Sequence, residues 1–311
     1  MMLRTHEHAG PLIADPHFKN AWLRVQRCHK SSAKGCRRQN LRLIGVSGVG
    51  KSRLLIEYRD AHPPIHHEEY TEVPVIYAEV PAQPTSRQLA VCLLTALGRP
   101  TESGTADELW KTFQRLCRIC KVRLILLDEI QHFVDRGRVS TYANDADILK
   151  QNLSKLDIPT VLAGAPRSRL LFEVNNQLRG RFKPIHALRP FAITNVDEIE
   201  RFTTSVATAA TTLPDKVIRF LISPAVIPRL FYATDGIFRN LLDYLDGLKT
   251  VLQDKTTCNL PLLSIAFRDT VWVPPSKTDD PFNESFVLRR LTEPGEPFMP
   301  SPMDGDNHAR Y

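Results

Sequence analysis

No uninterrupted apolar run in this chain approaches the roughly 20 residues that a membrane-spanning helix requires. Residues 1–8 also lack the apolar core of a secretory signal. Cysteine is sparse, with six in 311 residues. Cys117 and Cys120 have metal-like spacing, but no second such pair or histidine pair accompanies them, so we interpret them as buried helix cysteines. We therefore expect an intracellular protein with reduced thiols and no membrane partner.

Acidic residues are missing from two long stretches, 16–56 and 175–193, which are rich in lysine and arginine. The net charge of the whole chain is +7. Such asymmetry predicts a polyanionic partner beyond a nucleotide, most simply nucleic acid. The alternative is that some of these cations only solvate a helix face or surround the nucleotide.

One short segment matches the phosphate-binding pattern G-x-x-x-x-G-K-[ST]. An apolar run at 41–44 precedes it and a helical pattern follows, as a phosphate-binding loop requires. Lys51 is expected to reach the β and γ phosphates, and Ser52 to ligate magnesium. The residues expected to hold the nucleotide are Gly45, Val46, Ser47, Gly48, Val49, Gly50, Lys51, Ser52 and Arg53.

A second motif lies at 122–129, where an apolar run ends in Asp128 and Glu129. In this layout Asp128 holds the magnesium shell and Glu129 polarises the attacking water. No Asn-Lys-x-Asp motif follows, which disfavours guanine nucleotides. We therefore expect an ATPase with ATP and Mg²⁺ as its cofactors.

Apolar runs alternate with helical patterns between and after these motifs, which predicts an α/β fold with a parallel sheet flanked by helices and a small helical lid. Asn195 to Glu198 has capping-box spacing at the start of the helical lid. The expected domains are a basic helical N-terminal segment (1–40), an α/β nucleotide-binding core (41–193), the lid (194–253) and a proline-rich, partly disordered extension (254–311).

Three arginines have candidate roles in hydrolysis. Arg179 and Arg181 end a predicted helix and suit an arginine finger that completes the site of a neighbouring subunit. The other interpretation is a pair of charges at a helix C-terminus. Arg239, near the start of a lid helix, suits contact with the γ phosphate.

Five segments occur in an order and at spacings that resemble one family: GVSGVGKS, LILLDEIQHF, PTVLAGAP, QLRGRF and GIFRNLL. The chain resembles the TniB and TnsC family of AAA+ ATPases that regulate DNA transposition in bacteria, over about residues 18–248. The resemblance implies a cytoplasmic protein whose ATP-bound subunits assemble head-to-tail, as a ring or filament, on duplex DNA. It implies that the assembly marks a target site and links a target-selection protein to the transposase.

The same resemblance implies that Arg181, more than Arg179, is the finger and that Arg239 is the lid arginine. DNA contacts of such assemblies go to the backbone, and the matching candidates are Arg87, Arg99 and Lys111. One departure is that the predicted strand ending at Gly164 and Ala165 brings no polar side chain to orient water. Thr160 or Gln131 could substitute, or hydrolysis is slow.

Two other functions fit the same motifs. A signalling ATPase would switch a protein–protein interaction without DNA, but fewer residues follow the lid here than such proteins usually carry. A helicase-loader-like protein would hold single-stranded DNA, and its strand preference would distinguish it.

Overall fold

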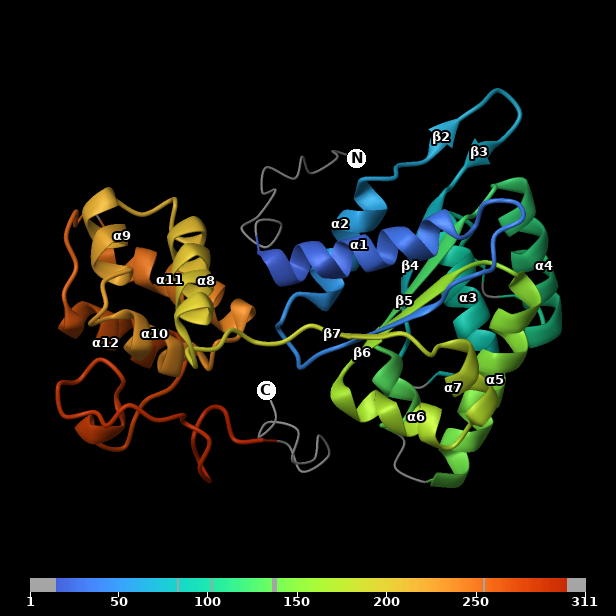
Figure 1. Ribbon diagram of the computed structural model, residues 1–311. Coiled ribbons are helices and arrows are strands. Elements are labelled where there is room, and N and C mark those ends of the chain that lie inside the picture. Colours follow the sequence, from blue (N-terminus) through green and yellow to red (C-terminus); the bar gives the residue numbers. More distant parts are fainter. Residues whose placement is uncertain (1–14, 83, 102, 136–138, 254, 301–311) are drawn as a thin grey trace. The chain divides into compact units, whose positions relative to one another are not determined.

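The computed structural model describes residues 15–82, 84–101, 103–135, 139–253 and 255–300, with the side chains of 139–145 left out. The chain divides into two units (Figure 1). Unit 1 contains the described residues of Met1–Lys19, Gly48–Gly50 and Arg189–Tyr311, and unit 2 contains those of Asn20–Ser47 and Lys51–Leu188. Within the described ranges, no helix combines the length and apolar character that a membrane span needs.

The described part of unit 2 is built on a sheet of five parallel strands in the order β4-β5-β6-β1-β7. The strands are β1 (Leu41–Ile44), β4 (Val75–Glu79), β5 (Leu124–Asp128), β6 (Thr160–Gly164) and β7 (Ile185–Ala187). A separate antiparallel hairpin pairs β2 (Ile65–His66) with β3 (Thr71–Glu72). Every residue of β1, β5 and β6 is buried, because these three strands are paired on both sides and apolar throughout most of their length.

Helices cover both faces of this sheet. They are α1 (Pro16–Lys30), α2 (Lys51–Asp60), α3 (Ser86–Ala96), α4 (Ala106–Ile119), α5 (Val139–Leu156), α6 (Arg169–Glu173) and α7 (Asn176–Arg181), with the 3₁₀ turns η2 (Ile130–Phe133) and η3 (Pro166–Ser168). Thr85 and Thr105 begin α3 and α4 as capping boxes, each accepting a bond from the third helical residue. These caps fix the start of the two helices.

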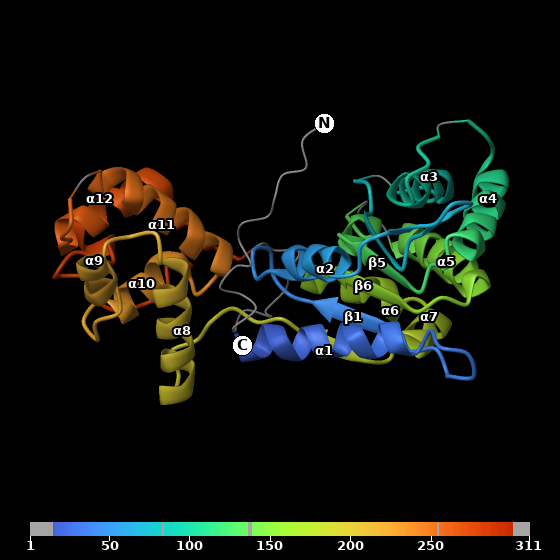
Figure 2. The ribbon, with the colours of Figure 1, turned by 90° about the horizontal axis from the view of Figure 1, so that it is seen from above.

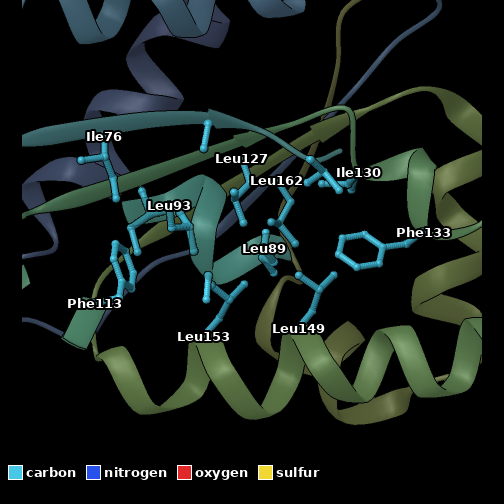
Figure 3. Close-up of a cluster of buried hydrophobic side chains, with 14 of the residues drawn as sticks. Ile76, Leu89, Leu93, Phe113, Leu127, Ile130, Phe133, Leu149, Leu153 and Leu162 are labelled. Atoms are coloured by element: carbon cyan, nitrogen blue, oxygen red, sulfur yellow. The ribbon is translucent and has the colours of Figure 1, made fainter. Parts of the chain in front are cut away.

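The main core lies between the sheet and helices α3 to α7. Figure 3 shows Leu127 and Leu162 of the sheet facing Leu149 and Leu153 of α5. Leu126 and Val161 alternate to the opposite face, which α2 covers. Ile130 and Phe133 of η2 are fully buried in the main core, so the turn that follows β5 is anchored at both ends.

Unit 1 is helical. Its helices are α8 (Val196–Ala209), α9 (Asp215–Leu221), α10 (Ile227–Thr234), α11 (Phe238–Leu252) and α12 (Leu260–Thr270), with the turn η4 (Lys277–Asp279). Asn195 caps α8 by accepting a bond from the Glu198 amide. Tyr244 of α11 donates to the Leu263 carbonyl (3.1 Å) and stacks on Phe282, so residues after 254 pack on the lid. Residues 1–14 and 301–311 lie outside the described residues.

Candidate functional site

The predicted phosphate-binding loop follows the C-terminal end of β1 and leads into α2, which begins at Lys51. Gly48 and Gly50 adopt φ of +82° and +99°, a backbone conformation that side-chain-bearing residues rarely take. The glycines of the motif are therefore needed for the path of this loop. The backbone N–H groups at the start of a helix such as α2 are the usual anion-binding element of such loops.

Lys51 is only 6% exposed, although it carries a charge. Its Nζ donates to the carbonyl oxygens of Gly45 (2.8 Å) and Val46 (3.0 Å), the first residues of the loop. These bonds hold the Lys51 ammonium at the phosphate-binding loop, where its charge is suited to a phosphate.

Asp128 ends β5 and is fully buried. The Ser52 hydroxyl bonds to its carboxylate, the Glu129 amide donates to its Oδ1 (2.9 Å), and Tyr77 Oη lies 3.3 Å from its Oδ2. Burial raises the pKa of Asp128, while the bonds from Ser52 and Glu129 oppose that rise. Tyr77 Oη also lies 2.8 Å from Glu79 Oε1. The structure thus brings the hydroxyl and carboxylate oxygens of Ser52 and Asp128 together, the donor type that magnesium prefers.

Glu129 has a left-handed backbone (φ 58°, ψ 35°), and its carboxylate accepts a hydrogen bond from the Gln131 side-chain amide. Gln131 Oε1 also accepts from the amide of Ala165, the residue after β6 (2.9 Å). Thr160 lies at the other end of β6, where its amide donates to Asn40 Oδ1 (2.9 Å). Of the two residues considered as substitutes at the end of β6, the structure places Gln131 there.

Arg181 lies beside the beginning of β1, because its carbonyl accepts a bond from the side chain of Asn40 (3.3 Å), the residue before that strand. Its guanidinium donates to the Leu153 carbonyl (3.1 Å), and burial lowers its pKa. Arg179 is exposed and donates to Asn176 (2.8 Å). The phosphate-binding loop follows the opposite end of β1, so neither arginine lies at the loop of its own chain.

Arg239 is the second residue of α11 and its side chain is exposed. Within unit 1, its amide donates to the Gly48 carbonyl (3.1 Å). Arg53, the last residue expected to hold nucleotide, forms an ion pair with Glu57 one turn along α2.

The three candidate DNA contacts are all exposed and belong to α3, α4 and the loop between them. Arg87 donates to the Gly104 carbonyl (3.1 Å), and Lys111 pairs with Asp107 (2.6 Å). The two helices lie side by side in both views (Figures 1 and 2). Arg87, Arg99 and Lys111 therefore belong to one pair of adjacent helices and the loop that joins them.

Some cations of the acid-free stretch serve the fold. Arg38 donates to the carbonyls of Ser31 (2.8 Å) and Asp157 (3.0 Å), tying the end of α1 to the end of α5. Arg42, in β1, is buried with its guanidinium 4.4 Å from the centre of the Phe172 ring. Neither Arg38 nor Arg42 is placed to bind a polyanion. Fewer cations of the stretch 16–56 are therefore available for such binding than its charge indicates.

Solved structures share this architecture. Cdc6p from Pyrobaculum aerophilum matches with a TM-score of 0.62 at 12% identity, over 88% of this chain and 71% of that one. The Orc1 protein of Aeropyrum pernix, solved in complex with DNA, matches with a TM-score of 0.57 at 15% identity, over 85% of this chain and 66% of that one. Domain III of the replication initiation protein DnaA from Thermotoga maritima matches with a TM-score of 0.52 at 16% identity, over 82% of this chain and 92% of that one. No curated protein matches in sequence.

These matches, with the loop after β1 and the acids at the end of β5, confirm the predicted AAA+ P-loop ATPase fold. The family model described as bacterial TniB protein matches residues 12–190, more than half of the chain. That match confirms the resemblance inferred from the five motif segments, and the chain belongs to the bacterial TniB family of AAA+ ATPases.

Proposed function

We propose that this ATPase assembles in its ATP-bound state on duplex DNA, marks a target site and links a target-selection protein to the transposase during DNA transposition. Membership of the TniB family supports the proposal. The observation that carries it is the separation of the hydrolytic groups. Lys51 and Asp128 lie at the loop edge of the sheet, whereas Arg181 lies at the beginning of β1. An arginine finger from this chain therefore serves a neighbouring copy, which makes assembly part of the catalytic cycle.

Within each site, Lys51 neutralises the β and γ phosphates, and Ser52 with Asp128 supplies oxygen ligands for magnesium. Magnesium, when bound, offsets phosphate charge. Glu129 accepts a proton from the attacking water as the water oxygen bonds to the γ phosphorus and the bond to the β-phosphate oxygen breaks. The family resemblance assigns Arg239 of the lid to the γ phosphate, and the hydrogen bond from the Arg239 amide to the Gly48 carbonyl, within unit 1, is consistent with that role.

Duplex DNA is the proposed polyanion. Arg87, Arg99 and Lys111 are exposed on α3, α4 and the loop between them, and contacts to the DNA backbone need cations without base readout. The similar Aeropyrum pernix protein was solved with DNA, which supports a DNA-handling role for this fold. Because such contacts release counterions, we expect the affinity for plain duplex DNA to fall steeply as salt rises.

The first test uses electron microscopy of the full chain with a few hundred base pairs of plain duplex DNA. We expect Glu129→Gln with ATP to form rings or filaments on the DNA and to keep them much longer than the unsubstituted protein, because it binds ATP but does not hydrolyse it. ADP is the control. Free particles with every nucleotide would contradict DNA assembly, and preferential coating of single strands would favour a loader-like function. Failure of Glu129→Gln to bind ATP would contradict the role of Glu129.

A further inference from the structure

Gln131 connects the side chain of Glu129, two residues before it, to the end of β6, which is distant in sequence. It follows Glu129 by two residues in η2, and only 5% of it is exposed. Its Nε2 donates to the Glu129 carboxylate, and its Oε1 accepts from the Ala165 amide (2.9 Å). A carboxamide carries a donor and an acceptor on one planar group, so both bonds form at once.

The surroundings leave this amide little freedom. A Cβ on Gly164 would lie 2.7 Å from Gln131 Oε1 and 2.7 Å from Ile130 Cγ1, so the space exists because residue 164 is glycine. The Gln131 carbonyl accepts bonds from the amides of Val134 (2.8 Å) and Asp135 (3.0 Å), which fix its backbone. The Gly164 carbonyl in turn accepts from Gly45, at the start of the phosphate-binding loop (3.2 Å).

Glu129 depends on such support, because it lies outside regular structure. Its left-handed backbone differs from both the strand before it and the turn after it. Its amide is bonded to Asp128 Oδ1, which fixes the main chain but leaves the side chain to be oriented by its own partners. The Gln131 bond holds Oε2 of this side chain.

We propose that Gln131 is a positioning residue for ATP hydrolysis. It holds Oε2 of Glu129 so that Oε1 is presented to the attacking water, whose proton passes to Glu129 while hydroxide adds to the γ phosphorus and ADP leaves. Gln131 also supplies, from η2, the polar side chain that Gly164 and Ala165 do not bring to the end of β6. The inference rests on the proposed role of Glu129 as the group that polarises water.

Two substitutions separate positioning from structural support. Gln131→Glu keeps an acceptor for the Ala165 amide but replaces the amide donor with a second carboxyl group beside Glu129, whereas Gln131→Met has similar length and makes neither bond. We expect both to lower kcat by about 10- to 100-fold while the KM for ATP stays within about threefold, as for a group acting on the chemical step. Steady-state ATPase assays on the full chain, with duplex DNA present, measure both constants.

If Gln131 only supports the end of β6, Gln131→Glu keeps the unsubstituted kcat, and that result overturns the proposal. Gln151→Glu in α5 is the matched control, because this glutamine is exposed and gains the same charge. Thermal unfolding midpoints show whether each variant folds. Should Gln131→Met fail to fold, the Gln131→Glu assay still decides.

A double-mutant cycle with Glu129→Gln tests whether Gln131 acts through Glu129. We expect Glu129→Gln/Gln131→Met to hydrolyse ATP no more slowly than Glu129→Gln alone, because the group that Gln131 positions is already lost. A further multiplicative loss in the double variant contradicts the inference about Gln131. A Glu129→Gln variant that hydrolyses ATP at the unsubstituted rate contradicts the role of Glu129 instead, so the two failures are distinguishable.

Discussion

His29, near the end of α1, is a buried base whose surroundings disfavour its charged form. Its Nδ1 lies 3.1 Å from the Tyr58 hydroxyl, and its ring meets that of His62 edge-on with centroids 4.8 Å apart. Burial, with the nearby His62 and Arg123, lowers its pKa from 6.5 to about 4. The folded chain therefore binds fewer protons here than the unfolded chain between these two pH values.

This difference makes stability depend on pH. Above pH 6.5 the contribution of neutral His29 is fully present, and it is lost as the pH falls toward 4, because only the unfolded chain takes up the proton there. Over this interval we expect the free energy of unfolding to fall by up to about 3 kcal/mol more in the unsubstituted protein than in His29→Gln. Urea denaturation at a series of pH values measures it, and parallel curves for the two proteins would contradict the assigned shift.

The lid contains an ion pair that connects α10 to the C-terminal extension. Asp235 ends α10 in a left-handed conformation, and its carboxylate accepts two bonds from Arg290 (2.7 and 2.6 Å). The Asp235 side chain is 3% exposed, whereas that of Arg290 is 36% exposed. The pair fixes the turn that leads to Arg239, so residues after 254 support the lid arginine.

Removing either partner should therefore have unequal effects. Arg290→Ala leaves a buried carboxylate without this partner and should lower the free energy of unfolding by about 2–4 kcal/mol. Asp235→Asn keeps a residue that tolerates the left-handed backbone and leaves only a half-exposed guanidinium, so its cost should be smaller. Chemical denaturation of both variants and their combination checks this order, and equal costs would contradict it.

The elements that the sequence predicts well are those with strong local patterns. The strand at 41–44 is found with those bounds. Its three apolar residues and the buried Arg42 lie between Asn40 and Gly45, residue types that favour turns. The start of α5 at Val139 is not evident from the sequence, because residues 139–144 show no apolar periodicity. The strand predicted from Val122 begins at Leu124, since the Val122 amide bonds to Cys117 and closes α4.

The candidate site likewise has parts that the sequence predicts and parts that it does not. Its loop and acids follow from contiguous motifs, and the structure brings Ser52 and Asp128 together as their spacing predicts. The sequence leaves Gln131 and Thr160 as alternatives at the end of β6, and it does not indicate the pair of Arg290 with Asp235. The Gln131 bond to Ala165 and the Arg290 pair join residues 34 and 55 positions apart. Contacts of that kind depend on strand order and loop path, which one sequence does not encode as a local pattern.

For the whole molecule, the proposed assembly predicts catalysis shared between copies. Arg181→Ala subunits retain complete loops and acids, and Glu129→Gln subunits retain the finger. Each variant alone should hydrolyse ATP poorly. An equal mixture should recover about a quarter of the unsubstituted rate, because with random neighbours that share of sites combines the intact acid of an Arg181→Ala subunit with the intact arginine of a Glu129→Gln neighbour. Arg179→Ala is the control for the other candidate finger. A mixture that only averages the two variants would contradict a finger acting between copies.

The position of Arg181 at the beginning of β1, away from the loop at its end, has a further consequence for such an assembly. An open row of identical subunits has one terminus whose nucleotide has no neighbour to complete its site, and another whose arginine has no nucleotide to serve. The two termini are chemically unequal, and the row has a direction along the DNA. The subunit with the uncompleted site keeps its ATP longest, so loss of subunits should proceed unequally from the two ends.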